Sequence, residues 1–260
     1  MSVRIGWERH GSGAPLLLIH GLGYARWGWE PVLPDLAERF DVILFDNRGI
    51  GESDSPPGPY TAREMAEDAV QVLDEAGVER AHVVGTSLGG MVAQELALAH
   101  PERVDRLVLA CTTPGGPKAH PMPQQTVALM AEAGTLEPAV ALRRFVENAL
   151  APKTVAARPE LVDRIMTHRL ATAQSPVAWA AQAAAGMTFD AYDRLGGLRA
   201  PTLVQHGGED AVVDPRNGDL LAELVPAARL DPFPGTGHLF FWEEPERFVT
   251  SLTAFLEETA

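Results

Sequence analysis

Short hydrophobic runs recur along the chain and alternate with stretches that have helical spacing. The first run, residues 3–8, has the length and composition of an edge strand. Buried-type strands are expected at Pro15–Ile19, Asp41–Asp46, His82–Gly85, Val104–Ala110, Pro201–Gln205 and Ala228–Leu230. Because helical patterns separate these runs, the sequence predicts an α/β fold with a mostly parallel sheet and helices on both faces.

The helical stretches carry start and stop signals. Thr61 and Glu64 have capping-box spacing, in which the hydroxyl and the carboxylate each accept from a backbone N–H of the first turn. Gly77 then predicts the end of this helix. Further helices are expected at Trp29–Arg39, from Ser87 to the residues before Pro101, and at Glu246–Leu256.

The strand rhythm is interrupted in the middle of the chain. From about Pro114 to Met187 the sequence is rich in Ala, Met, Leu and Arg, and no strand pattern occurs. Helices are predicted there at Gln125–Ala133, Pro138–Leu150, Glu160–Ala173 and Pro176–Ala185. Since chain on both sides is needed to complete the sheet, residues 1–113 and 188–260 are expected to form one core and 114–187 a helical insertion.

Composition and charge narrow the function classes. The chain has 260 residues, 46% hydrophobic and 22% charged, which is ordinary for a globular enzyme. The formal net charge of −14, without a basic stripe, makes nucleic acids and membrane surfaces poor partners. The single cysteine, Cys111, excludes an intramolecular disulfide and is expected to be a buried hydrophobe.

The N-terminus has no secretory pattern, and no apolar run is long enough to cross a membrane, so a cytoplasmic enzyme is expected. Whether the chain forms a homo-oligomer stays open.

Residues 85–89 read Gly-Thr-Ser-Leu-Gly directly after a predicted strand and directly before a predicted helix. This G-x-S-x-G pattern in a strand–turn–helix context is typical of a nucleophile elbow, which exposes a serine hydroxyl on a sharp turn. Glycines are needed beside the serine because side chains there would collide with backbone. Ser87 is therefore the candidate nucleophile.

A serine nucleophile needs a base and an orienting acid. Asp210 follows the strand Pro201–Gln205, at the strand end where open α/β sheets bind ligands. His238 ends a glycine-rich loop after the last strand, and it alone among the histidines both follows the acid and lies on such a loop. Asp214 and Glu209 are rival acids. His206 is expected to support the loop of Asp210.

The segment His20-Gly21-Leu22-Gly23 follows the first central strand, and its glycines let backbone N–H groups turn toward the site. The backbone N–H groups of Leu22 and Leu88 are the candidate oxyanion hole. No histidine pair has metal-ligand spacing, so neither a metal nor another cofactor is expected.

These segments resemble the α/β-hydrolase superfamily over nearly the whole chain. The matching motifs are HGLG at 20–23, DNRGIGES at 46–53, GTSLGG at 85–90, HGGED at 206–210 and GTGH at 235–238. The resemblance implies an eight-stranded, mostly parallel sheet with a helical cap, here 114–187, inserted after the sixth strand. A serine at the elbow argues against haloalkane dehalogenases and epoxide hydrolases, whose nucleophile is an aspartate, and the chain looks most like small carboxylesterases and enol-lactonases.

The substrate is less readable than the mechanism. The residues expected to line an apolar pocket are Trp27, Phe145, Trp179 and Met187, although each could instead pack the protein interior. Three interpretations stay open: a carboxylesterase for small-molecule esters, a lactonase similar to 3-oxoadipate enol-lactonases, and a ligand receptor on the same fold. The lactonase interpretation requires a cation inside the pocket, for which Arg143 and Arg144 are candidates, although a solvated helix face suits both.

Overall fold

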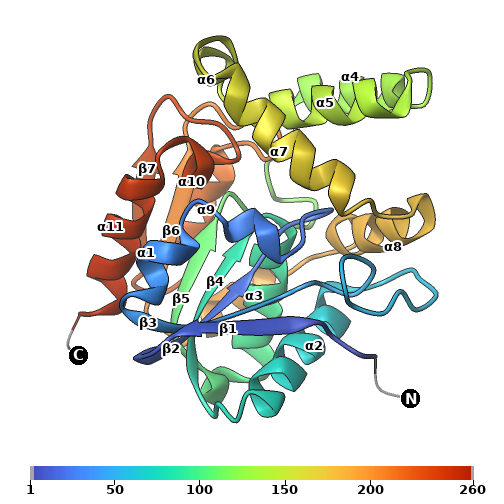
Figure 1. Ribbon diagram of the computed structural model, residues 1–260. Helices are drawn as coiled ribbons and strands as arrows, with labels where there is room; N and C mark the ends of the chain where they lie inside the picture. Colours follow the sequence, from blue (N-terminus) through green and yellow to red (C-terminus); the bar gives the residue numbers. More distant parts are fainter. Residues whose placement is uncertain (1–2, 259–260) are drawn as a thin grey trace.

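The computed structural model describes residues 3–258, which form a mostly parallel sheet flanked by helices (Figure 1). The sheet has seven strands in the order β1-β3-β2-β4-β5-β6-β7. Only β1 is antiparallel to its neighbour, β3. The strands are β1 (Trp7–Gly11), β2 (Ala14–Ile19), β3 (Phe40–Phe45), β4 (Ala81–Thr86), β5 (Val104–Ala110), β6 (Thr202–Gly207) and β7 (Arg229–Phe233). The α/β fold class predicted from the hydrophobic pattern is confirmed.

The resemblance implied eight strands, whereas the described residues form seven, and each of the seven strands expected from the hydrophobic pattern overlaps one of them. The edge strand expected at residues 3–8 begins only at Trp7, which pairs with Phe45. The backbone before it bonds to the loop after β3 instead of to the sheet. The Asp46 N–H donates to the Gly6 carbonyl at 2.9 Å, and the Asp54 N–H donates to the Arg4 carbonyl at 2.9 Å.

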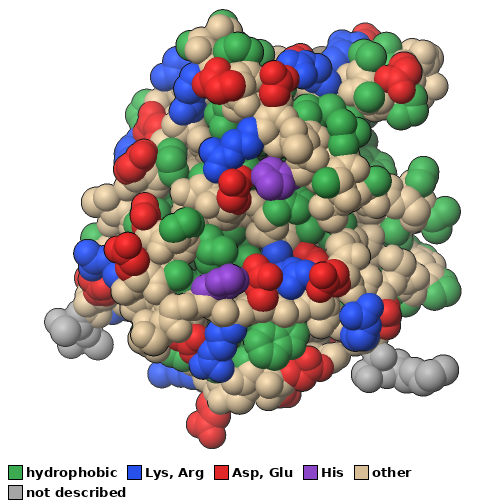
Figure 2. Space-filling model, in the orientation of Figure 1, with side chains coloured by type: hydrophobic (Ala, Val, Ile, Leu, Met, Phe, Trp, Pro, Cys, Tyr) green, Lys and Arg blue, Asp and Glu red, His purple; other side chains and the backbone are tan. Residues whose placement is uncertain are grey.

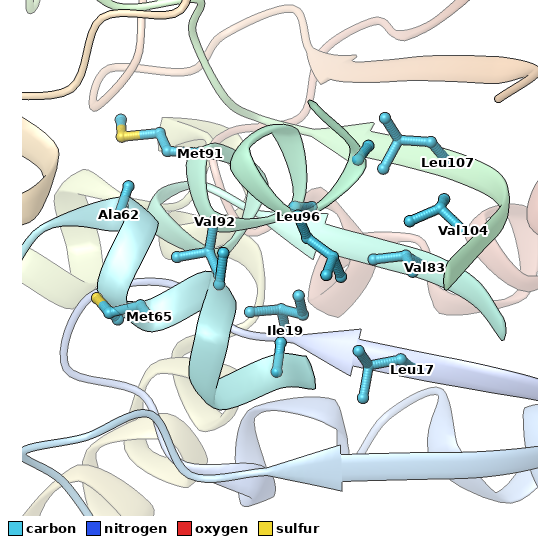
Figure 3. Packing of buried hydrophobic residues seen from close by; sticks show 14 of the residues in the cluster. Leu17, Ile19, Ala62, Met65, Val83, Met91, Val92, Leu96, Val104 and Leu107 are labelled. Atoms are coloured by element: carbon cyan, nitrogen blue, oxygen red, sulfur yellow. The ribbon is translucent and has the colours of Figure 1, made fainter. Parts of the chain in front are cut away.

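Alternate side chains of the central strands enter two separate hydrophobic cores. Leu17 and Ile19 of β2 belong to one core, whereas Leu16 and Leu18 belong to the other. The first core is closed by α2 (Ala62–Glu75), α3 (Leu88–Ala99) and α9 (Arg216–Leu224), and the second by α1 (Leu33–Ala37), α10 (Phe240–Glu243) and α11 (Pro245–Leu256). Figure 3 shows the first core, where side chains of α2 and α3 meet the sheet. Because helices cover both faces of the sheet, the sequences of the central strands are continuous hydrophobic runs.

One predicted helix differs in form. Instead of a helix over Trp29–Arg39, the chain makes a 3-10 turn at Arg26–Trp29 and the short α1. Pro31 lies between the two, because proline lacks the N–H that an interior helical position must donate, and Pro34 is tolerated in the first turn of α1, where no such N–H is needed. Two further 3-10 turns occupy Pro101–Arg103 and Tyr192–Gly197.

Five helices separate β5 from β6. They are α4 (Gln124–Ala133), α5 (Pro138–Asn148), α6 (Pro152–Ala157), α7 (Pro159–Ala171) and α8 (Pro176–Met187). Figure 1 shows them gathered on one side of the sheet. They fall within the predicted insertion 114–187, but five strands precede it and not six, since the sheet lacks one strand. Among the described helices, none combines the length and the apolar character that crossing a membrane requires.

Candidate active site

Ser87 occupies the turn between β4 and α3 in a strained conformation. Its φ is +54°, a left-handed value that non-glycine residues rarely adopt. Two hydrogen bonds hold the turn: the Ser87 N–H donates to the Ala110 carbonyl at 2.9 Å, and the Thr112 hydroxyl donates to the Ser87 carbonyl at 2.7 Å. Such strain persists only where surrounding structure enforces it, and here it presents the serine side chain to a cavity.

The glycines that flank the serine are sterically required. A Cβ at Gly85 would lie 2.3 Å from the Gly89 carbonyl oxygen, and one at Gly89 would lie 2.1 Å from the Ile19 carbonyl oxygen. Both contacts are with backbone, which cannot rotate away. The elbow therefore forms only because this sequence omits side chains on both sides of Thr86-Ser87-Leu88.

The loop after β2 packs directly against the serine. A Cβ at Gly21 would lie 2.9 Å from the Cβ of Ser87. The Asn47 amide donates to the His20 carbonyl at 2.8 Å, which fixes the loop from its far side. The backbone N–H groups of Leu22 and Leu88 have no acceptor among residues 3–258. Two free donors thus accompany the serine, as an oxyanion hole requires.

His20 stays uncharged beneath this loop. Burial lowers the pKa of His20 to about 3. Its Nδ1 accepts a hydrogen bond from the Gly21 N–H at 2.7 Å. A neutral imidazole can accept this bond, whereas a protonated one could not. His20 therefore stabilises the turn at Gly21 and Leu22 through this hydrogen bond.

Asp210 and His238 come together from the ends of two neighbouring strands, β6 and β7. His238 Nδ1 lies 2.7 Å from Asp210 Oδ2. The other carboxylate oxygen accepts from the N–H groups of Val212 and Val213 at 2.8 and 2.9 Å. Both ionisable side chains are buried. The acid thus fixes one ring nitrogen of His238 and leaves the other for a partner.

A second imidazole contacts the same acid. His206 Nε2 lies 3.1 Å from Asp210 Oδ2 and 3.2 Å from the Val213 carbonyl oxygen. Burial alone would raise the pKa of Asp210, but the interactions with His238 and His206, including a hydrogen bond from each imidazole, outweigh burial and hold that pKa below its usual range. His206, expected only to support the loop, therefore also helps keep Asp210 ionised.

The rival acids point elsewhere. Asp214 Oδ1 and Oδ2 accept from the Arg216 guanidinium at 2.9 and 2.5 Å. Glu209 is exposed. The structure thus pairs His238 with Asp210 and not with either rival. No hydrogen bond joins Ser87 to His238 within the described part of the chain, but both residues line one cavity.

This cavity has a volume of about 1120 Å³ and lies between the strand ends and the insertion. Ser87, Leu22, Leu88 and His238 contribute to its floor, and most of the remaining lining is hydrophobic. Figure 2 shows the surface hollowed between the lobe of α4 and α5 and the lobe of α8, with hydrophobic side chains in the hollow. A cavity of this kind suits a small molecule with apolar parts.

Three of the four expected pocket residues line this cavity. Phe145 and Trp179 are partly buried walls, whereas Met187 is 82% exposed and so lies at the opening. Trp27 was placed wrongly, because it does not line the cavity. Its ring stacks on His168 of α7 with centroids 4.9 Å apart, since Trp27 lies in the 3-10 turn at Arg26–Trp29.

The sequence reading missed Glu243, which ties the His238 loop to the insertion. Its buried carboxylate accepts from the Gly237 N–H at 2.6 Å and from the Ala151 N–H at 3.2 Å. A lone carboxylate in a four-residue helix carries no pattern that would reveal this. Residues 3–258 contain no group of three or more His, Cys, Asp or Glu side chains that could hold a metal ion.

Comparison with known proteins settles the family. The sequence profile described as alpha/beta hydrolase fold matches residues 14–245. The chain belongs to the α/β-hydrolase family. It is accordingly a hydrolase.

Its relatives carry the names of different hydrolases. A protein of Azorhizobium caulinodans named "Putative carbamate hydrolase RutD" is 34% identical, over 97% of this chain and 94% of its own. The solved structure of an enol-lactonase from Burkholderia xenovorans LB400 superposes with a TM-score of 0.86 at 25% identity, covering 98% of this chain and 97% of its own. A thermophilic esterase from Thermogutta terrifontis superposes with a TM-score of 0.82 at 29% identity, covering 98% and 93%.

Proposed function

We propose that this hydrolase cleaves carboxylic esters through an acyl-enzyme on Ser87, as a carboxylesterase does. The observation that carries the proposal is the hydrogen bond of 2.7 Å between His238 and buried Asp210, beside a serine held at φ +54° in the same cavity. A neutral imidazole oriented by a carboxylate is the base that a serine hydroxyl needs.

The steps follow from the positions of these groups. Ser87 attacks the ester carbonyl while His238 takes its proton. The N–H groups of Leu22 and Leu88 stabilise the oxyanion, and His238 then returns the proton to the departing alcohol. Water, deprotonated by His238, cleaves the acyl-enzyme. Asp210 orients the imidazole and stabilises its cation throughout.

The names of the relatives support acyl transfer as the shared chemistry. Carbamates, lactones and esters all place an oxygen or nitrogen leaving group on a carbonyl carbon, so one serine mechanism serves each. Lactone hydrolysis is the second candidate for this chain, and one cation in the cavity lining favours an acidic substrate of that kind.

The first test is hydrolysis of p-nitrophenyl esters of increasing acyl length by the parent, Ser87→Ala and Ser55→Ala. Ser55 is exposed and outside the cavity, so it is a matched control. We expect Ser87→Ala to lose about 10⁴-fold or more in kcat, the usual cost of removing a triad nucleophile, and Ser55→Ala to match the parent. The acyl length with the highest kcat/KM measures the apolar depth of the cavity.

Turnover that survives in Ser87→Ala would overturn the proposal. An inactive parent that is strongly stabilised by small ligands would indicate the receptor alternative instead, since a receptor on this fold needs the cavity without rapid turnover.

A further inference from the structure

One arginine lines the cavity without a carboxylate partner. Among the described residues, only Arg169 and Asp214 bring full charges of opposite sign to the lining. Asp214 is already paired with Arg216, at 2.5 Å between Oδ2 and the guanidinium. No Asp or Glu oxygen of residues 3–258 lies within 4.0 Å of the guanidinium of Arg169. The cavity therefore carries one uncompensated positive charge.

Arg169 is held next to the reacting centre. It projects from α7, and its guanidinium donates to the Gly23 carbonyl and lies 4.9 Å from the centre of the Tyr24 ring. Gly23 directly follows Leu22, whose N–H is one of the two free donors beside Ser87. The stacking and the single carbonyl fix the plane of the guanidinium, while its remaining N–H groups have no acceptor among the described residues.

The arginines that the sequence suggested for this role are occupied elsewhere. Arg143 bonds Glu147 at 3.0 Å and Asp163 at 2.8 Å, and Arg144 bonds Glu132 at 2.8 Å. Neither lines the cavity. Both lie on solvated helix faces, as the charge pattern also allowed, so the cation of the cavity is Arg169 alone among the described arginines.

A partly buried cation beside apolar walls attracts an anion more strongly than a fully solvated cation does, because less water screens the attraction. The neighbouring walls include Trp179 and Leu170, which provide no compensating charge. A guanidinium also matches a carboxylate geometrically, because two parallel N–H groups can bond its two oxygens. The chain as a whole is strongly anionic, with a net charge of −14, so a local cation of this kind offsets the repulsion that an anionic substrate meets.

We propose that Arg169 binds a carboxylate of the substrate, and that the esters or lactones cleaved here carry a free carboxylate on the acyl side. This inference rests on the proposed function, because it names the substrate class of the same site. The acyl group would extend from Ser87 toward α7, with its methylene groups against the apolar walls and its carboxylate on the guanidinium.

The test compares two p-nitrophenyl esters that differ only in charge: the glutarate half-ester with its free carboxylate, and the same ester capped with methanol. The proteins are the parent, Arg169→Gln, Arg169→Lys and the control Arg143→Gln. We expect the parent to prefer the free acid, and Arg169→Gln to lose about tenfold more kcat/KM on the free acid than on the capped ester, the size of one charged hydrogen bond.

The controls separate an anion site from a structural brace. Arg169→Lys should recover part of the preference because it keeps the charge, and Arg143→Gln should keep the preference of the parent. Increasing salt should weaken the preference, since it screens the attraction. Equal losses on both esters in Arg169→Gln would overturn the proposal and make Arg169 only a support of the Gly23 loop.

Calorimetry keeps the inference testable if ester hydrolysis fails. Glutarate itself is titrated into Ser87→Ala, with and without Arg169→Gln. Weaker binding by about tenfold on loss of Arg169 supports the carboxylate site whatever the chemistry at Ser87. Equal affinity, or no binding to either protein, contradicts it. Failure of the proposed function appears instead as turnover that ignores Ser87→Ala.

Discussion

Four donors surround the buried carboxylate of Asp210, and this environment decides which acid serves the site. Two of them are imidazoles, His206 and His238, and two are the backbone N–H groups of Val212 and Val213. A carboxylate held in this way stays ionised despite burial, because hydrogen bonds to the charged form favour it. It can therefore stabilise the imidazolium that forms when His238 removes a proton.

Replacing Asp210 by asparagine should separate it from its rival. We expect Asp210→Asn to lower kcat by about 10⁴-fold, because the amide disturbs both the tautomer and the charge balance of His238. Asp214→Asn removes a partner of Arg216 and should change kcat by less than about tenfold. The measurement is kcat on the best p-nitrophenyl ester at neutral pH, and a larger loss for Asp214→Asn would reverse the assignment.

Some individual residues of the site could be predicted from the sequence, and others could not. Ser87 could be found because its motif, strand and helix are contiguous in the chain. Asp210 and Asp214 share one loop, and only the turn at Val212–Val213 determines which carboxylate faces His238. Arg169 could not be singled out, since its place in the cavity depends on how α7 packs across the loop after β2.

Among the elements, the close approach of β2 to α3 is what brings the oxyanion donors to the serine. Gly89 lies in the first turn of α3, against the carbonyl of Ile19 at the end of β2. Glycine lets the backbones of helix and strand approach so closely that the N–H groups of Leu22 and Leu88 share one cavity floor.

A methyl group at this contact should separate the two elements. We expect Gly89→Ala to lower the free energy of unfolding by about 3 kcal/mol or more, because the added Cβ would overlap backbone and not a movable side chain. Gly134→Ala is the matched control: nothing lies within 4 Å of its added Cβ, and its effect should stay within about 1 kcal/mol. Urea unfolding compares the two, and equal stabilities would refute the packing argument.

Periodicity predicted most strands and helices to within a few residues, and its failures have physical causes. The helix expected at Trp29–Arg39 is interrupted at Pro31, which a count of apolar spacing ignores. Helix α9 was not anticipated, although Leu221 is buried in its middle and Pro215 stands at its start. Its pattern covers only nine residues, which is too short for apolar spacing alone to predict a helix.

For the molecule as a whole, the parallel sheet gathers loops that are far apart in the sequence. Ser87, Asp210 and His238 follow β4, β6 and β7, which end at the same edge of the sheet. This arrangement follows from the order of elements, so the sequence could predict the edge where chemistry occurs. Which side chains line the cavity depends on how α4–α8 pack above it, and no local sequence pattern specifies this packing.

The face of the molecule drawn in Figure 2 carries charged side chains of both signs. On the face in Figure 2, acidic and basic side chains are interspersed. The uncompensated charge relevant to a substrate lies inside the cavity, at Arg169.

The central claim is that Ser87 forms a covalent acyl-enzyme, and the mass of the protein tests it most directly. The parent and Ser87→Ala are mixed with a p-nitrophenyl ester, quenched in acid within the first turnover, digested and weighed by mass spectrometry. The account predicts one added acyl group on the peptide that contains Ser87 in the parent, and none in Ser87→Ala. An acyl group on another residue, or one that persists in Ser87→Ala, would contradict it.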